Sequence, residues 1–167
     1  MNLQSIHILG GQSTVSTDPN TVLVTILGSC VSACIYDPVA SVGGMNHFIL
    51  PTGGLLETAD REMRYGDVAL RVLVDDLCRC GAERRRLEAK LYGGRMRAFG
   101  GPRIGARNAA FAKRFLLSEG IRLVEESLGD DLARWVTFHP TTGRTWMRAT
   151  ADVEAPVSAA TPTRWAS

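Results

Sequence analysis

Three short apolar runs, each ended by a turn residue, follow one another near the start of this chain of 167 residues. The runs are Thr21–Leu27, Val31–Tyr36 and Ser41–Leu50, and they end at Gly28, Asp37-Pro38 and Pro51. Runs of this length that are rich in β-branched or aromatic residues and bounded by glycine or proline are typical of strands. Residues 6–51 are therefore predicted to be rich in β-structure.

Helical spacing appears in the middle of the chain. Apolar residues recur at the helical period between residues 67 and 81, where Asp67 is positioned to cap the helix and Gly81 to end it. A second helix is predicted over residues 107–119, with Gly120 as its stop.

Further strands are predicted on both sides of the second helix, at residues 87–92, 121–124, 134–138 and 144–148. Strands and helices are thus mixed without strict alternation. This order favours an α+β fold, a layered α/β sandwich, over a doubly wound parallel sheet.

The composition indicates one folded domain and a tail. A hydrophobic content of 45% with 22% charged residues is ordinary for a globular protein of this length. Residues 1–150 are predicted to form the domain. Residues 151–167 are dominated by Ala, Pro, Thr, Ser and Val, and they are predicted to be a disordered tail.

The apolar runs are too short for a membrane span. The first residues lack the pattern of a secretory signal, which is a basic region followed by an apolar run. We therefore expect a cytoplasmic protein without membrane insertion. The net charge is only +2, and no basic stripe with interleaved aromatic residues appears, so nucleic acid is not an expected partner. The one dense basic cluster, Arg84–Arg86, is typical of a solvated face, with an acidic partner as the alternative.

The four cysteines are Cys30, Cys34, Cys78 and Cys80. In a chain without an export signal they argue against a disulfide framework. Their spacings differ from those of zinc sites, and the three histidines are scattered, so neither a metal nor another cofactor is expected.

Cys30 is the candidate nucleophile because it follows Gly28-Ser29, where the backbone can turn tightly and present N–H groups to an oxyanion. His47 follows two glycines and is the candidate base. The alternative is that Cys30 is a small buried apolar residue and His47 a satisfied core or surface residue. Spacing alone leaves both interpretations open. Cys34 fits a structural role better, as do Cys78 and Cys80.

Longer stretches carry a family resemblance. Leu27–Pro38 and Gly43–Pro51 closely resemble the bacterial chemotaxis family CheD, the chemoreceptor glutamine deamidases. Later blocks of the same family pattern are Arg64–Gly66, Leu87–Gly94, Ile104–Asn108 and Pro140–Arg144. The resemblance runs in order from Ile6 to Arg148 and leaves out the tail.

The resemblance implies an α/β sandwich that is similar to the catalytic domain of the cytotoxic necrotizing factor toxins. It also implies that Cys30 and His47 are the catalytic cysteine and histidine. The family's third catalytic residue is a threonine just upstream of the cysteine. Thr25 and Thr21 are both available, and Thr25 is the preferred assignment.

The implied activity is hydrolysis of receptor glutamine side chains to glutamate through a thioester, as part of chemotaxis adaptation. Glutamyl methyl esters pass through the same acyl-enzyme, so ester hydrolysis is a second expected activity. The expected partners are the cytoplasmic helices of methyl-accepting chemoreceptors and a CheC-type phosphatase. The alternative is a binding module for these partners without catalysis, but the presence of both Cys30 and His47 favours an enzyme.

The segment between Tyr92 and Asn108 is rich in glycine and arginine. The segment lacks the Lys-Ser/Thr ending of a phosphate-binding loop. The favoured interpretation is therefore a loop that connects the strand to the helix and packs beside the active site. Its arginines, Arg95, Arg97, Arg103 and Arg107, are candidates to grip acidic receptor or partner surfaces. Asn108 is expected to cap the helix or to fix a loop.

Overall fold

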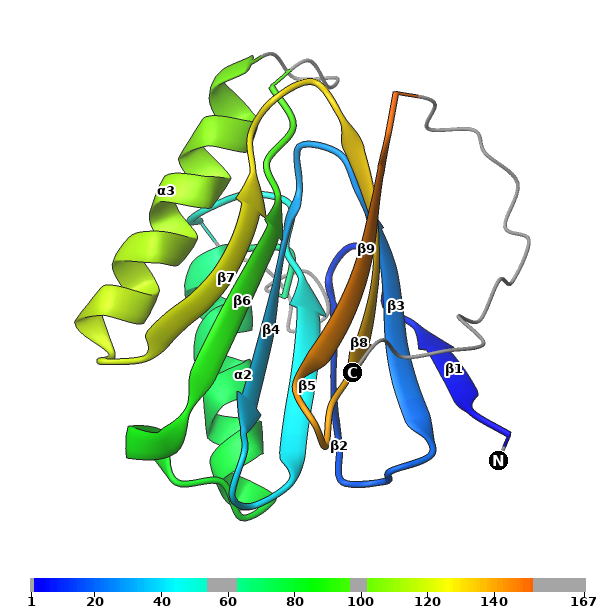
Figure 1. The fold of residues 1–167 in the computed structure, drawn as a ribbon. Helices are drawn as coiled ribbons and strands as arrows, with labels where there is room; N and C mark the ends of the chain where they lie inside the picture. Colours follow the sequence, from blue (N-terminus) through cyan, green and yellow to red (C-terminus); the bar gives the residue numbers. More distant parts are fainter. Residues whose placement is uncertain (1, 54–62, 97–101, 152–167) are drawn as a thin grey trace.

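A computed structural model describes residues 2–53, 63–96 and 102–151. In this part of the chain, two β-sheets lie face to face, and two helices cover the outer face of the larger sheet (Figure 1). The predicted α+β layered fold is confirmed. The predicted tail, apart from Ala151, lies outside the described residues.

The smaller sheet has the strand order β1-β3-β8-β9. β1 pairs with β3 in parallel, and the other neighbours are antiparallel. Its strands are β1 (Gln4–His7), β3 (Thr21–Leu27), β8 (Ala133–His139) and β9 (Arg144–Thr150).

The larger sheet has the strand order β2-β5-β4-β6-β7, and its only parallel pair within the described residues is β6 with β7. Its strands are β2 (Gln12–Ser16), β4 (Val31–Asp37), β5 (Val42–His47), β6 (Glu88–Gly93) and β7 (Arg122–Leu128). The chain therefore crosses from one sheet to the other between β3 and β4, at residues 28–30.

Alternation along β4 divides the core into two layers. Val31, Ala33 and Ile35 belong to the cluster shared with the helices, whereas Cys34 and Tyr36 belong to the cluster between the two sheets. Because side chains alternate along a strand, β4 is buried on both faces, which explains why it reads as a continuous apolar run.

The helices are α2 (Gly66–Arg79) and α3 (Pro102–Ser118). The expected cap of α2 was wrong: the N-cap residue is Tyr65, and Asp67 lies in the first turn, where a carboxylate interacts favourably with the helix dipole. α3 begins earlier than predicted, because proline is well suited to the first helical position. The helix also tolerates Gly105, where a β-carbon would overlap the carbonyl oxygen of Arg95.

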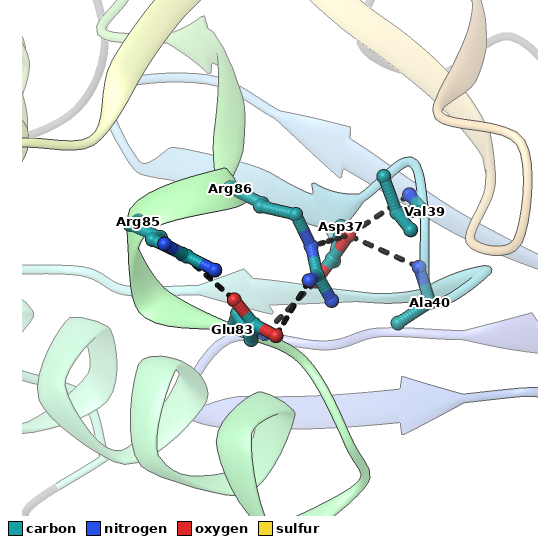
Figure 2. Close-up of polar contacts among 6 residues, drawn as sticks. All are labelled: Asp37, Val39, Ala40, Glu83, Arg85 and Arg86. Carbon is teal, nitrogen blue, oxygen red and sulfur yellow. Dashed lines mark hydrogen bonds and ion pairs between the residues drawn. The ribbon is translucent and has the colours of Figure 1, made fainter.

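The arginine cluster forms a short 3-10 helix, η2 (Arg84–Arg86), and it is engaged within the chain. The buried carboxylate of Asp37 pairs with Arg86 at 2.8 Å and accepts the backbone N–H groups of Val39, Ala40 and Glu83 (Figure 2). These contacts tie the β4–β5 turn to the segment before β6. The arginine run is therefore a structural clamp and not merely a solvated face.

The strands predicted at residues 21–27, 31–36, 87–92, 134–138 and 144–148 are confirmed, with ends that shift by a residue or two. β5 ends at His47, before the predicted end at Leu50. β7 extends well beyond the predicted residues 121–124, to Leu128. β1 and β2 were not predicted as separate strands, because they are short, polar and partly exposed. None of the described helices is long and apolar enough to cross a membrane.

Candidate active site

Cys30 lies at the crossover between the two sheets, directly before β4. The next residue, Val31, exchanges two backbone hydrogen bonds with Phe48, at 3.1 and 3.0 Å. Cys30 is half-buried and packs against the cluster between the sheets. The thiol is thus held at the end of a paired strand and directed into the space between the sheets.

The backbone that follows β6 fixes this loop from one side. The N–H of Gly94 donates to the carbonyl of Cys30 at 2.9 Å, and the N–H of Arg95 donates to that of Gly28 at 2.8 Å. Gly93 has a φ of 114°, and a β-carbon there would overlap the Cys30 carbonyl oxygen. Only glycine allows such a close approach. We call residues 28–30 the nucleophile loop.

Asn108 fixes the same loop from the helix side. Its amide nitrogen donates to the carbonyl oxygens of Ser29, at 3.0 Å, and Ile49, at 2.8 Å. Its side chain is fully buried. Because α3 begins at Pro102, Asn108 lies inside the helix and does not cap it. The loop-fixing role expected from the sequence is therefore the one observed.

The strand register brings Cys30 and His47 to the same face. Cys34 pairs with Met45 across β4 and β5, and Val31 bridges Phe48, so Ser32 lies opposite His47. Cys30 is two residues before Ser32 and is therefore a diagonal neighbour of His47. Such diagonal pairs are about 7–8 Å apart, within reach of long side chains.

His47 is only 8% exposed, and the smaller sheet orients its ring. The Nδ1 atom is 2.9 Å from Oγ1 of Thr25 and 3.4 Å from the carbonyl oxygen of Ile8. The Thr25 hydroxyl donates to that same carbonyl at 2.6 Å, because a carbonyl oxygen can only accept.

The tautomer of His47 follows from these bonds. Since the Thr25 proton is directed to Ile8, the Thr25 oxygen must accept from Nδ1–H. A neutral imidazole with its proton on Nδ1 has an unprotonated Nε2 that can accept a proton. The arrangement therefore leaves Nε2 of His47 without a proton.

Thr21, the alternative to Thr25, has a different partner. Its hydroxyl donates to Asp18 at 3.0 Å, in the turn that precedes β3. The structure thus brings Thr25, and not Thr21, to the imidazole.

Burial acts on both ionisable groups of the site. Burial lowers the pKa of His47, and the hydrogen bond to Ile8 offsets part of this effect. Burial raises the pKa of the Cys30 thiol, and its own backbone N–H opposes the change. Both shifts favour a neutral thiol and a neutral imidazole.

The other cysteines have different surroundings. Cys34 is fully buried, and burial raises the pKa of its thiol far above the ordinary value. Cys78 is half-buried, and Cys80 is exposed after α2. No group of three or more potential metal ligands is found among the described residues.

The arginines expected to grip a partner are separated in the structure. Arg95 lies beside the nucleophile loop, whereas Arg103 and Arg107 are exposed on α3. Arg97 lies outside the described residues.

Comparison with known proteins identifies the family to which the chain belongs. Residues 49–149 match the family model CheD, described as CheD chemotactic sensory transduction. The chain belongs to the CheD family. Thr25, Cys30 and His47 precede the residues matched by this model, but they lie within a chain that aligns with CheD relatives over most of its length.

Three relatives share the printed name "Probable chemoreceptor glutamine deamidase CheD". That of Caulobacter vibrioides is 48% identical over 158 residues, which cover 95% of this chain and 84% of the relative. That of Sinorhizobium medicae is 46% identical, with coverages of 90% and 82%. That of Cereibacter sphaeroides is 45% identical, with coverages of 91% and 75%.

Among solved structures, the hypothetical protein YfiH of Bacillus licheniformis is similar, with 17% identity and a TM-score of 0.47. The similarity covers 69% of this chain and 49% of that protein.

Two contacts of this CheD site were missed by sequence reasoning. The carbonyl of Ile8 receives bonds from Thr25 and His47, and Gly93 packs on the Cys30 carbonyl. A backbone carbonyl carries no residue-specific signal, so the role of Ile8 could not be found. The paired glycines Gly93-Gly94 were the available signal for the second contact.

Proposed function

We propose that this CheD-family chain is a chemoreceptor glutamine deamidase in which Cys30 is the nucleophile, His47 the general base and Thr25 the residue that orients His47. The relatives' shared name supports the reaction. The observation that carries the assignment of roles is the 2.9 Å bond between Thr25 and Nδ1 of His47, because it leaves Nε2 available to the thiol.

The first half of the reaction forms a thioester. Nε2 of His47 takes the Cys30 proton as the sulfur attacks the carboxamide carbon of a receptor glutamine. The resulting oxyanion is stabilised by backbone N–H groups of the nucleophile loop. The imidazolium then gives its proton to the nitrogen, the C–N bond breaks, and ammonia leaves.

The second half releases glutamate. Nε2 of His47 removes a proton from water, and the hydroxide attacks the thioester carbon. The C–S bond breaks, and the sulfur regains the proton, so the enzyme returns to its starting state. Each turnover converts a neutral side chain to a carboxylate. A glutamyl methyl ester enters the same thioester with methanol as the leaving group, and we propose this as the second activity.

The intact mass of a receptor cytoplasmic fragment tests the proposal. Deamidation adds about one dalton and ester hydrolysis removes about fourteen, so one measurement separates the two outcomes of this acyl-enzyme mechanism. Cys30→Ala should abolish both changes. His47→Ala should slow alkylation of Cys30 by iodoacetamide, while the exposed Cys80 serves as an internal reference.

Two results would contradict the proposal. An active Cys30→Ala protein would exclude the nucleophile. A fragment that binds without any change of mass would favour the alternative, a binding module for receptors or for a CheC-type phosphatase. The cytoplasm is the proposed location, because the receptor helices that carry the substrate glutamines are expected there.

A further inference from the structure

One side of α3 carries a row of arginines. Arg103, Arg107 and Arg114 are all exposed. They are separated by four and seven residues, spacings that bring side chains to the same side of a helix. We call these three residues the α3 arginine row.

The α3 arginine row has no ion-pair partner within the described residues, whereas Lys113 of the same helix pairs with Glu126. Further basic residues that pair with carboxylates are Arg79, Arg84, Arg85, Arg86 and Arg122. The positive charge of the row is therefore available to a partner.

The row borders a hollow of about 290 Å³. Arg107 and Arg114 line it, together with Pro51, Thr52 and the ring of Phe111. An apolar side chain fits such a hollow while the two guanidinium groups reach carboxylates on either side of it. Forked hydrogen bonds of this kind suit arginine better than lysine.

The hollow lies next to the nucleophile loop. Asn108, the neighbour of Arg107, donates to the carbonyls of Ser29 and Ile49. Ile49 in turn leads directly to Pro51, a wall of the hollow. A partner seated there is thus close to the backbone of the nucleophile loop, on its α3 side.

We propose that the α3 arginine row and its hollow form the docking surface for an acidic, amphipathic helix of the protein substrate. This inference rests on the proposed function and adds the surface that recognises the substrate. The hollow favours a protein helix over a phosphate backbone or an anionic membrane, because phosphates would use the arginines but not the apolar walls. The modest net charge of +2 points the same way.

Direct binding tests this proposal apart from catalysis. The binding of a receptor cytoplasmic fragment would be measured with Cys30→Ala and with Cys30→Ala carrying Arg107→Glu and Arg114→Glu. We expect the dissociation constant to rise at least about tenfold and its salt dependence to flatten. The matched control carries Arg144→Glu and Arg148→Glu, an equal charge change on β9, and should bind like its parent.

The outcomes are separable. Equal loss of affinity in both double variants would overturn the docking surface, since net charge alone would explain it. A different result would overturn the choice of partner. In that case the receptor fragment does not bind, but vesicles of anionic lipid do, and the vesicle binding is lost with Arg107→Glu and Arg114→Glu. A fragment that binds through the row but is never deamidated by the parent enzyme would refute the proposed function and not the docking surface.

A second inference concerns the Ser29–Cys30 peptide. Asn108 binds the Ser29 carbonyl from the α3 side at 3.0 Å. In a planar trans peptide the C=O and N–H point in opposite directions. Anchoring the Ser29 oxygen on the helix therefore turns the Cys30 N–H away from the helix, toward the space between the sheets. Among the described residues no backbone carbonyl accepts from this N–H, and its only partner there is the Cys30 sulfur itself.

We infer that Asn108 is a positioning residue that directs the Cys30 N–H at the oxyanion. This inference also rests on the proposed function. It is independent of the docking surface, because it depends on a buried side chain and not on the exposed row. An oxyanion donor contributes only to acyl transfer, whereas alkylation of a thiol by iodoacetamide forms no oxyanion.

The two reactions therefore test the role of Asn108. Asn108→Ala should lower kcat for deamidation about 100-fold with little change in KM, while alkylation of Cys30 keeps its rate within a few-fold. Asn108→Ser retains one donor and should recover part of kcat. The matched control is Asn46→Ala, which removes another fully buried asparagine, one that accepts the backbone N–H of Ala33. The control should lower stability without changing the ratio of the two rates.

Parallel loss of deamidation and alkylation in Asn108→Ala would overturn the inference, because the residue would then hold the thiol and not the donor. If Asn108→Ala does not fold, the ratio is read from Asn108→Ser, and an unchanged ratio there overturns it equally. An inactive wild-type enzyme would refute the proposed function instead.

Discussion

Thr25 and His47 belong to different sheets, and a hydrogen bond of 2.9 Å between Oγ1 and Nδ1 joins them. The bond has its direction because the Thr25 hydroxyl donates to Ile8, in the segment that follows β1. The packing of one sheet on the other thus sets the tautomer of the imidazole. A strand pair alone would not fix it.

We expect Thr25→Val to lower kcat for deamidation about 10- to 100-fold, the range found when a residue that orients a metal-bound histidine is lost. KM should change little, because Thr25 does not reach solvent. Mass analysis of the receptor fragment measures the rate. Thr21→Val is the control, since its hydroxyl binds Asp18 in the turn. A larger loss in Thr21→Val than in Thr25→Val would contradict the assignment.

The sequence alone could not distinguish these two threonines. Thr21 and Thr25 are four residues apart on β3, so the alternation of a strand puts both on the same face. What separates them is the position along the strand relative to His47, which the packing of the sheets determines. The strands themselves were predictable because their β-branched runs end at glycine or proline.

Contacts that hold the nucleophile loop were predictable only in part. Gly28 indicated a tight backbone turn before Cys30, and Gly93-Gly94 indicated a connection beside the site, but neither showed which atoms meet. Asn108 was expected to fix a loop or cap a helix, and the choice depended on where α3 begins. The glycines before it favoured a loop assignment, whereas α3 begins at Pro102, a residue that suits the first helical position.

The pH profile of the reaction follows from the pKa of His47. Burial lowers this pKa below its ordinary value of 6.5, so the imidazole is still an unprotonated base in mildly acidic solution. The acid limb of kcat/KM should therefore lie below pH 6.5. Steady-state rates from pH 5 to 8 test this, with the His47 ring resonances followed by NMR as an independent titration. An acid limb above the ordinary value would indicate an imidazolium stabilised by the Cys30 thiolate.

Gly93→Ala should damage the site more than an ordinary loop substitution. A β-carbon at Gly93 would overlap the Cys30 carbonyl, so the nucleophile loop must move, and small misplacements of reacting groups cost about 100-fold in rate. Gly129→Ala is the matched control. It also has a positive φ, of 80°, but its β-carbon meets no heavy atom within 4 Å in the described structure.

Both variants should lose some stability, about 1 kcal/mol, from the left-handed backbone conformation. Only Gly93→Ala should also lose most of its deamidation rate. Thermal unfolding and fragment mass analysis measure the two effects separately. Equal rates in the two variants would mean that the loop does not depend on the contact between Gly93 and Cys30.

The buried carboxylate of Asp37 should make the free energy of unfolding depend on pH in the acidic range. Burial acts to raise its pKa, but the hydrogen bonds from Arg86 and from the N–H groups of Glu83, Ala40 and Val39 more than offset this (Figure 2). The net pKa is therefore well below the ordinary 3.8. A carboxyl with a lowered pKa stabilises the folded state fully above its unfolded pKa and loses that contribution as the pH falls toward the folded one.

Asp37→Asn should accordingly be less stable than the wild type by a constant amount above about pH 4, with a thermal midpoint several degrees lower. Below that pH the gap should narrow, because Asp37 takes up a proton in the unfolded wild-type chain while it is still ionised in the folded one, which stabilises the unfolded state. Urea unfolding between pH 3 and 7 measures the gap. Asp76→Asn removes an exposed partner of Arg79 and should show almost no gap at any pH, because exposed pairs contribute little. A gap for Asp37→Asn that widens in acid would show that burial, and not the clamp with Arg86, dominates the carboxyl.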